Sequence, residues 1–135
     1  MKKIKVTIVG ATTWGTTLAL MVSREGINTA LLVRSKTESS KMIQEGQNSR
    51  FLPGAIFPNN LSTTHLVESA FDSSSIAIYA VPSATFRTNV VETIPHIPQD
   101  TVIVSASKGL ELSTGKRMTE ILGWSLAVLF SVPVL

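Results

Sequence analysis

A short apolar run that ends in a glycine-rich turn and leads directly into an amphipathic segment constrains this fold more than any other feature. Residues 4–9 read IKVTIV, and residues 14–24 carry apolar side chains at the spacing of a helix. Residues 10–15, GATTWG, connect the two segments. The sequence therefore predicts a strand, a tight turn and a helix, which is how a parallel α/β unit begins.

Short apolar runs alternate with helical patterns along the rest of the chain. We expect further strands over residues 28–33, 76–81, 101–105 and 125–130. We expect further helices over residues 35–44, 65–71, 83–94 and from Ser113 or Thr114 to Leu122, with Ser83 as a helix cap. Residues 46–60 hold two prolines and two glycines and are expected to form an ordered loop. This alternation predicts one doubly wound, mostly parallel α/β domain.

Composition excludes several kinds of function. Of the 135 residues, 44% are hydrophobic and 16% are charged, which is typical of one globular domain. The absence of cysteine excludes disulfides and thiolate chemistry, and we expect His65 and His96 at the surface, with no metal site. A net charge of +3 from scattered basic residues does not favour nucleic-acid binding. The longest apolar tail, residues 125–135, is shorter than the roughly 20 residues that cross a bilayer, so we expect a cytoplasmic protein without a membrane span.

The turn between the first strand and the first helix is a candidate phosphate site. Dinucleotide-binding folds place a pyrophosphate at the N-terminus of this helix. Gly10 and Gly15 fit such a turn, but Thr12 stands where a glycine normally lets the phosphates approach, and its Cβ should push them outward. Gly10 and Gly15 also have the spacing of a nucleotide-triphosphate P-loop, which Thr16 excludes because that loop needs lysine there. The alternative is a tight turn without a ligand.

The residues after the second strand bear on the choice of dinucleotide. An NAD site normally has Asp or Glu about 20 residues beyond the glycines, and this chain has none there. Arg34, Ser35 and Lys36 could instead accept a 2′-phosphate, so NADP is permitted beside NAD. The alternative is that both basic side chains are ordinary surface charges. The crevice for either cofactor should lie where Gly10 and Pro82 end their strands.

The residues in and around the glycine turn resemble those of a known family. IVGATTWGTTLALMVSREG resembles the N-terminus of NAD(P)-dependent glycerol-3-phosphate dehydrogenases, whose pattern is GAGSWGTALA. Five further segments resemble that family's successive motifs in order: RFLPG at 50–54, FPNNL at 57–61, AVPS at 80–83, SASKGLE at 105–111 and TGKRM at 114–118. The resemblance covers residues 4–129 and implies that residues 1–135 form a Rossmann-type dinucleotide-binding domain.

The resemblance also implies roles for individual side chains. In that family, the positions of Thr13, Trp14, Arg34 and Phe51 contact the cofactor, and Lys108 lies beside the substrate phosphate and the nicotinamide. The alternatives are core packing for the aromatic side chains and a solvated loop position for the lysine. Lys108 is thus the expected substrate contact. The expected cofactor-binding residues are Gly10, Thr12, Thr13, Trp14, Gly15, Arg34, Ser35, Phe51, Pro82 and Lys108.

The resemblance stops near the end of the chain. Family members continue into an S-G-P motif and a helical domain that supplies a second lysine as general acid–base, whereas this chain has Val132 at the glycine of that motif and ends at Leu135. We therefore expect a truncated cofactor-binding domain with no catalytic residue of its own. The alternatives are a dehydrogenase completed by a separate chain, or a non-binding structural remnant. The apolar tail, with Phe130, Val132 and Val134, predicts a homodimer, and the alternative is that the tail folds back over its own sheet.

Overall fold

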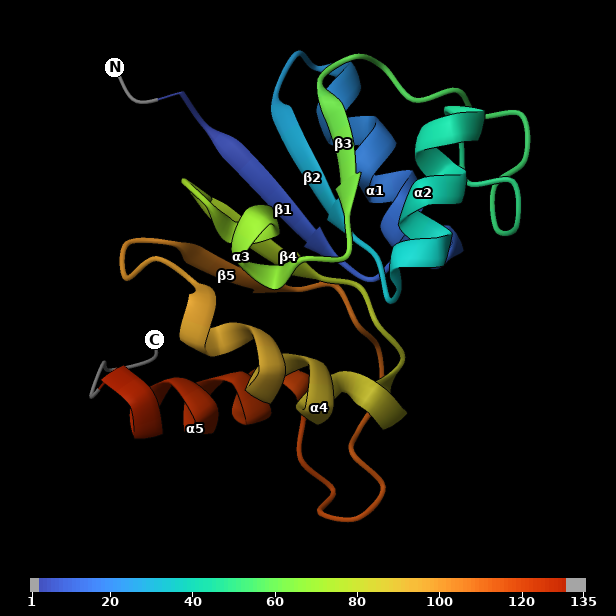
Figure 1. Cartoon of the computed structure of the whole chain (residues 1–135). Coiled ribbons are helices and arrows are strands. Elements are labelled where there is room, and N and C mark those ends of the chain that lie inside the picture. The colour runs from blue at the N-terminus through green and yellow to red at the C-terminus, as the bar shows by residue number, and fades with distance from the viewer. Residues whose placement is uncertain (1–2, 131–135) are drawn as a thin grey trace.

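A five-stranded parallel sheet organises the molecule, with helices on both of its faces (Figure 1). The computed structural model describes the backbone of residues 3–130 and the side chains of residues 3–126. The strands are β1 (Lys5–Val9), β2 (Asn28–Leu32), β3 (Leu61–Thr64), β4 (Ile76–Tyr79) and β5 (Val102–Ser105). The helices are α1 (Thr13–Arg24), α2 (Lys36–Glu45), α3 (Val67–Phe71), α4 (Ser83–Thr93), the short 3₁₀ helix η1 (Ile94–His96) and α5 (Met118–Phe130).

The strand order places β1 in the middle of the sheet. The order is β3-β2-β1-β4-β5, and every neighbouring pair is parallel. The chain therefore winds outward from β1 to β3 and then returns to the other side of β1 with β4. This reversal lies between β1 and β4, where a doubly wound sheet opens a crevice for ligands. The predicted doubly wound parallel fold is confirmed.

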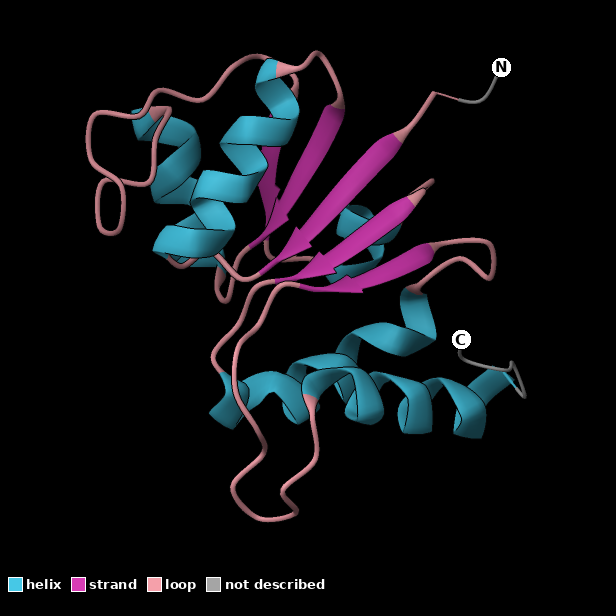
Figure 2. Ribbon diagram, turned by 180° about the vertical axis from the view of Figure 1, so that it is seen from behind, coloured by secondary structure: helices cyan, strands magenta, loops and turns pink. Residues whose placement is uncertain are grey.

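Two apolar cores cover the two faces of the sheet. Figure 2 shows from behind the helices that lie on each face. On one face, Ala19 and Leu20 of α1 and Met42 of α2 pack against strand side chains such as Ile8. On the other face, α3, α4 and α5 cover Tyr79, which is fully buried. Burial on both faces explains why residues 76–81 read as a continuous apolar run.

Strand β3 is absent from the elements predicted by sequence. Its residues, LSTT, include only one large apolar side chain, and their burial alternates between the two faces. It pairs with β2 alone and so forms an edge of the sheet. A short edge strand with one buried face needs few apolar residues, which is why its sequence resembles a polar loop.

The predictions for the last third of the chain were wrong in two places. The helix expected from Ser113 or Thr114 begins only at Met118, because a bridge between Leu110 and Arg117 keeps the preceding residues in a loop. The strand expected over residues 125–130 is the second half of α5. Short apolar runs do not distinguish strand from buried helix, and here the helix packs against α4.

Ser83 does not cap α4: Pro82 occupies the N-cap position, and the first turn has no side-chain cap. The expected dimer contact concerns Phe130, Val132 and Val134, and all three side chains lie outside the described residues. Within residues 3–130, no helix has the length and apolar character needed to cross a membrane.

Candidate functional site

The two glycines of the turn after β1 allow very close backbone approaches. Gly10 has a φ of +110°, and a Cβ at this position would lie 2.8 Å from the carbonyl oxygen of Ala80. A Cβ on Gly15 would overlap the carbonyl oxygen of Gly10. Only glycine fits at either position without movement of the backbone. The turn thus brings the N-terminus of α1 against the carboxyl ends of β1 and β4.

Thr12 is the N-cap residue of α1, a role that the sequence analysis did not assign to it. Its hydroxyl accepts a hydrogen bond from the Gly15 N–H at 3.4 Å and donates one to the Ala80 carbonyl at 3.3 Å. The first backbone N–H groups of a helix have no partner within it, so those of Thr13 and Trp14 remain directed out of the helix end. This end of α1 carries the positive pole of the helix and suits an anion.

A crevice of about 590 Å³ opens beside this helix end, and we call it the β1–β4 crevice. Its walls come from the glycine turn, the loop before β3, the end of β4 and the segment after β5. The lining residues are Thr12, Thr13, Trp14, Phe51, Ala80, Val81, Pro82, Ala106, Ser107 and Lys108. The lining is mostly apolar with a few polar groups, which is the usual character of cofactor sites.

Two side chains of α1 span the crevice and fix its width. The indole N–H of Trp14 donates to the Ala106 carbonyl at 3.1 Å, beyond the end of β5. The hydroxyl of Thr13 donates to the Phe51 carbonyl at 3.2 Å, in the loop before β3. Trp14 is 50% exposed, so its ring lies over the crevice rather than in the core.

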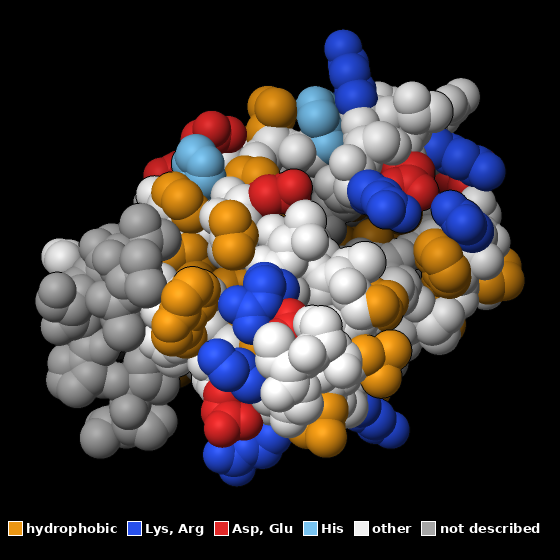
Figure 3. All heavy atoms as spheres, turned by 90° about the horizontal axis from the view of Figure 1, so that it is seen from below, with side chains coloured by type: hydrophobic (Ala, Val, Ile, Leu, Met, Phe, Trp, Pro, Cys, Tyr) orange, Lys and Arg blue, Asp and Glu red, His pale blue; other side chains and the backbone are white. Residues whose placement is uncertain are grey.

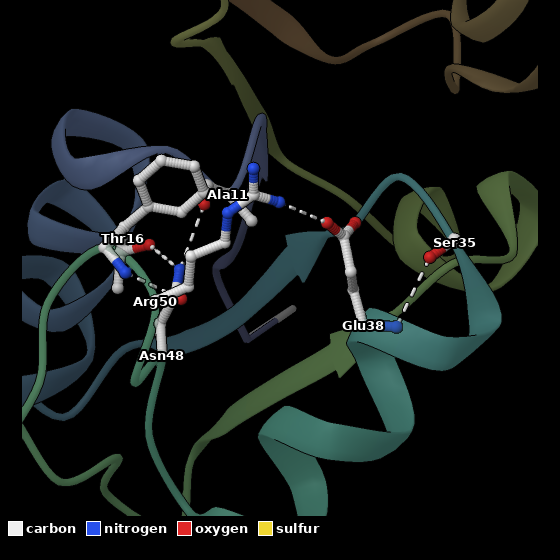
Figure 4. Close-up of polar contacts among 7 residues, drawn as sticks. Ala11, Thr16, Ser35, Glu38, Asn48 and Arg50 are labelled. Carbon is white, nitrogen blue, oxygen red and sulfur yellow. Dashed lines mark hydrogen bonds and ion pairs between the residues drawn. The ribbon is translucent and has the colours of Figure 1, made fainter.

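Asn48 connects the loop at 46–60 to the glycine turn, and the sequence analysis missed it (Figure 4). Its amide nitrogen donates to the Ala11 carbonyl at 3.0 Å and to the Thr16 hydroxyl at 2.8 Å. Its amide oxygen accepts from the Phe51 N–H at 3.3 Å. Asn48 is only 1% exposed, so this buried amide depends on all three bonds. It fixes both the turn and the aromatic wall.

The residues at the start of α2 do not line the crevice. Arg34 is exposed, and the hydroxyl of Ser35 caps α2 by accepting from the Glu38 N–H at 3.3 Å. The Glu38 carboxylate pairs with Arg50 at 3.2 Å, as Figure 4 shows, and the Arg50 guanidinium lies 4.8 Å from the centre of the Phe51 ring. An acidic side chain, Glu38, therefore lies near the start of α2, but its carboxylate is already paired with Arg50 of the loop at 46–60.

Lys108 lies where the sequence predicts, beyond the end of β5 on the crevice wall. The preceding residue, Ser107, holds the wall together: its hydroxyl accepts from the Val81 N–H at 3.1 Å and donates to the Tyr79 carbonyl at 3.2 Å. Sequence reasoning missed Ser107, although its place beside Lys108 in the SASKGLE motif was a usable signal. Lys108 itself is exposed to solvent.

The structure thus brings together most of the predicted residues. Gly10 and Gly15 shape the turn, and only Arg34 and Ser35 lie apart from the crevice, at the start of α2. Neither histidine lines the crevice, and His96 lies 3.6 Å from the Glu68 carboxylate. The predicted residues that line the crevice are Thr12, Thr13, Trp14, Phe51, Pro82 and Lys108.

Comparison with known proteins identifies the family. The sequence matches the family model for the N-terminus of NAD-dependent glycerol-3-phosphate dehydrogenase over residues 5–134. The chain belongs to this family. It is 37% identical over 122 residues to a glycerol-3-phosphate dehydrogenase [NAD(P)+] of Desulfotalea psychrophila, which covers 90% of this chain. It is 35% identical over 119 residues to the enzyme of the same name from Corynebacterium glutamicum, which covers 88%.

This glycerol-3-phosphate dehydrogenase family domain has counterparts among solved structures. The glycerol-3-phosphate dehydrogenase of Coxiella burnetii superimposes with a TM-score of 0.87 at 28% identity, over 93% of this chain and 38% of that one. The yeast enzyme has a TM-score of 0.80 at 20% identity, over 92% and 39% of the two chains, and shares the fold. The chain spans about 36% of the length of the first two curated relatives. The predicted resemblance to an N-terminal, NAD-binding domain is confirmed.

Proposed function

We propose that the β1–β4 crevice of this chain binds NAD or NADP as the cofactor half of a glycerol-3-phosphate dehydrogenase. The observation that carries the proposal is the open N-terminus of α1 at the point where the sheet reverses direction. Hydrogen bonds that Trp14 and Thr13 donate, and those that the Ser107 hydroxyl accepts and donates, hold the crevice walls together. Walls held by the protein's own hydrogen bonds lose less conformational entropy on binding.

The residues present fit a dinucleotide. The backbone N–H groups of Thr13 and Trp14 would bind the pyrophosphate at the helix end. Arg34 and Ser35 at the start of α2 would face the adenosine ribose and would tolerate a 2′-phosphate, while Lys108 would lie near the nicotinamide and the substrate phosphate. When bound, the nicotinamide supplies hydride transfer between glycerol 3-phosphate and dihydroxyacetone phosphate. The chain's own residues bind and orient the cofactor.

The Thr12 side chain should limit the affinity for dinucleotides. Because it lines the crevice at the helix end, we expect Thr12→Gly to tighten NADH binding by about 1–2 kcal/mol, or roughly 5- to 30-fold, through one or two recovered phosphate hydrogen bonds. Loss of the cap should lower stability by only a few tenths of a kcal/mol. Isothermal titration measures the affinity. Thr12→Ser keeps both the Cβ and the capping hydroxyl and should bind as the wild type does. Equal affinities for the glycine and serine variants would contradict this account.

The isolated chain should not turn over its substrate. Among the side chains that the structure describes, residues 3–126, Lys108 is the only ionisable one that lines the crevice, and it belongs to the wall that we assign to cofactor and substrate phosphate. Oxidation of an alcohol also needs a group that takes the hydroxyl proton. We expect the rate with glycerol 3-phosphate and NAD to stay far below about 1 s⁻¹, the low end for ordinary enzymes. Absorbance of the reduced nicotinamide measures this, with the Desulfotalea enzyme as positive control. Turnover near 1 s⁻¹ would show that the chain completes a site by itself.

A further inference from the structure

The loop at 106–117 carries Lys108 into the crevice and then projects away from the sheet (Figure 2). Its distal part is internally bonded: the Glu111 N–H donates to the Lys116 carbonyl at 2.9 Å, and the Gly115 N–H donates to the Glu111 carbonyl at 2.7 Å. Leu112 at the tip is 98% exposed. The loop therefore gains little from apolar burial, and its position depends on polar contacts with the rest of the domain.

One ion pair connects this loop to α4. The Arg87 guanidinium donates two hydrogen bonds to the two carboxylate oxygens of Glu111, at 2.7 and 2.8 Å. Such two-pronged pairs fix orientation as well as distance. The Thr114 hydroxyl donates to the same carboxylate. Glu111 lies three residues after Lys108, so the pair restrains the loop close to the lysine.

Glu111 stays ionised at neutral pH, so its pair with Arg87 stays charged there. Hydrogen bonds from Arg87, and then from Thr114, lower the pKa of Glu111 from 4.5 to about 2. Because the folded pKa lies below the unfolded one, the pair contributes to stability above about pH 4.5 and loses that contribution as the pH falls toward 2. Any test at neutral pH therefore examines the fully charged pair.

Helix α4 supports the loop at a second point and in turn rests on α5. A Cβ on Gly109 would lie 3.5 Å from the hydroxyl oxygen of Ser83, the first residue of α4, so the loop passes directly over this helix end. The Arg87 guanidinium lies 5.6 Å from the centre of the Trp124 ring of α5. Figure 3 shows this side of the molecule, where basic, acidic and apolar side chains are intermixed. Arg87 is thus placed between a carboxylate and an aromatic ring.

We propose that Arg87 is a positioning residue that holds the loop at 106–117 through Glu111 and thereby keeps Lys108 on the crevice wall. The inference rests on the proposed dinucleotide function. Ser107 fixes the loop before Lys108, and Glu111 fixes it afterwards, so the lysine lies between two anchors. Without the Glu111 anchor, Lys108 and Gly109 lose their restraint on the distal side and become more mobile.

Hydrogen exchange tests whether the pair orders the loop, and the test needs no ligand. We expect Arg87→Met and Glu111→Gln each to accelerate exchange of the hydrogen-bonded amides of Glu111, Thr114 and Gly115 by about tenfold or more at neutral pH. The matched control is Glu45→Gln, which makes the same change in the exposed Lys41–Glu45 pair of α2, on the other face of the sheet. It should leave exchange in residues 108–116 within about twofold of the wild type. Unchanged exchange in the Arg87 and Glu111 variants would overturn the inference.

A double-mutant cycle with NADH distinguishes positioning from general support. Lys108→Ala should weaken NADH binding by about fivefold in the wild type and by less than about twofold in the Arg87→Met background, because the lysine is already displaced there. A general loss of stability would leave the two Lys108 effects equal, and that result would also overturn the inference.

If the wild type binds neither NADH nor NADPH, the proposed function fails, and hydrogen exchange alone decides whether Arg87 holds the loop. Should Arg87→Met not fold, Glu111→Gln takes its place in the cycle.

Discussion

Gly15→Ala is expected to destabilise the domain by at least about 3 kcal/mol, because the added methyl group overlaps the Gly10 carbonyl oxygen. Both atoms belong to the rigid turn between β1 and α1, so relief requires the helix to move away from the sheet. Denaturant unfolding measures the loss. The same movement would displace the N-terminus of α1, so dinucleotide binding should disappear in any folded fraction.

The matched control is another glycine-to-alanine change. Gly26 follows α1 with a φ of +80°, and a Cβ there would meet no atom within 4 Å. Gly26→Ala should therefore show only the conformational penalty of a left-handed residue, about 1–2 kcal/mol. If Gly15→Ala proves no more harmful than Gly26→Ala, the close approach of α1 to β1 is not as the structure describes it.

Asn48→Asp should be the most damaging change outside the turn. The replacement puts a carboxylate oxygen where the amide nitrogen donates to the Ala11 carbonyl and the Thr16 hydroxyl. A buried carboxylate facing a carbonyl oxygen loses a hydrogen bond and gains repulsion, which together should lower the free energy of unfolding by about 3 kcal/mol or more. The wall formed by Phe51 should detach as well, and faster hydrogen exchange in residues 46–60 would report it.

Asn59→Asp provides the control for this change. Asn59 lies in the same loop and is exposed, so the identical chemical replacement should change stability by less than about 0.5 kcal/mol. Comparable losses in the two variants would mean that added negative charge, rather than the buried amide, causes the effect. The Asn48 network would then have no special role in shaping the crevice.

Local signals in the sequence predicted the part of the fold that places the site. The run before Gly10, the amphipathic segment after it and the buried run at 76–81 each have a strong pattern, and the parallel sheet follows from their alternation. Edge strand β3 could not be predicted, because a strand with one covered face needs few apolar residues. The helix at Met118–Phe130 was mistaken for a strand in its second half, because its apolar run fits either form.

The sequence could predict those parts of the site whose positions follow from the strand order alone. The carboxyl ends of parallel strands meet at one edge, so Gly10, Pro82 and Lys108 had to lie close together once the strand order was assumed. Asn48 and Ser107 were missed because their importance comes from carbonyl groups that belong to distant segments. Thr12 was expected to contact the cofactor and to push its phosphates outward, and its capping role was missed, although a threonine before a helix is a common N-cap.

The central claim is that the β1–β4 crevice binds a dinucleotide, and Trp14 offers a direct test. The chain has two tryptophans, and Trp124→Phe leaves Trp14, on the crevice wall, as the single tryptophan. Titration of this variant with NADH and with NADPH should quench Trp14 emission along a saturating curve, with a Kd of about 10–500 μM that matches the calorimetric value. Absence of both quenching and heat, with either dinucleotide at about 1 mM, would contradict the claim.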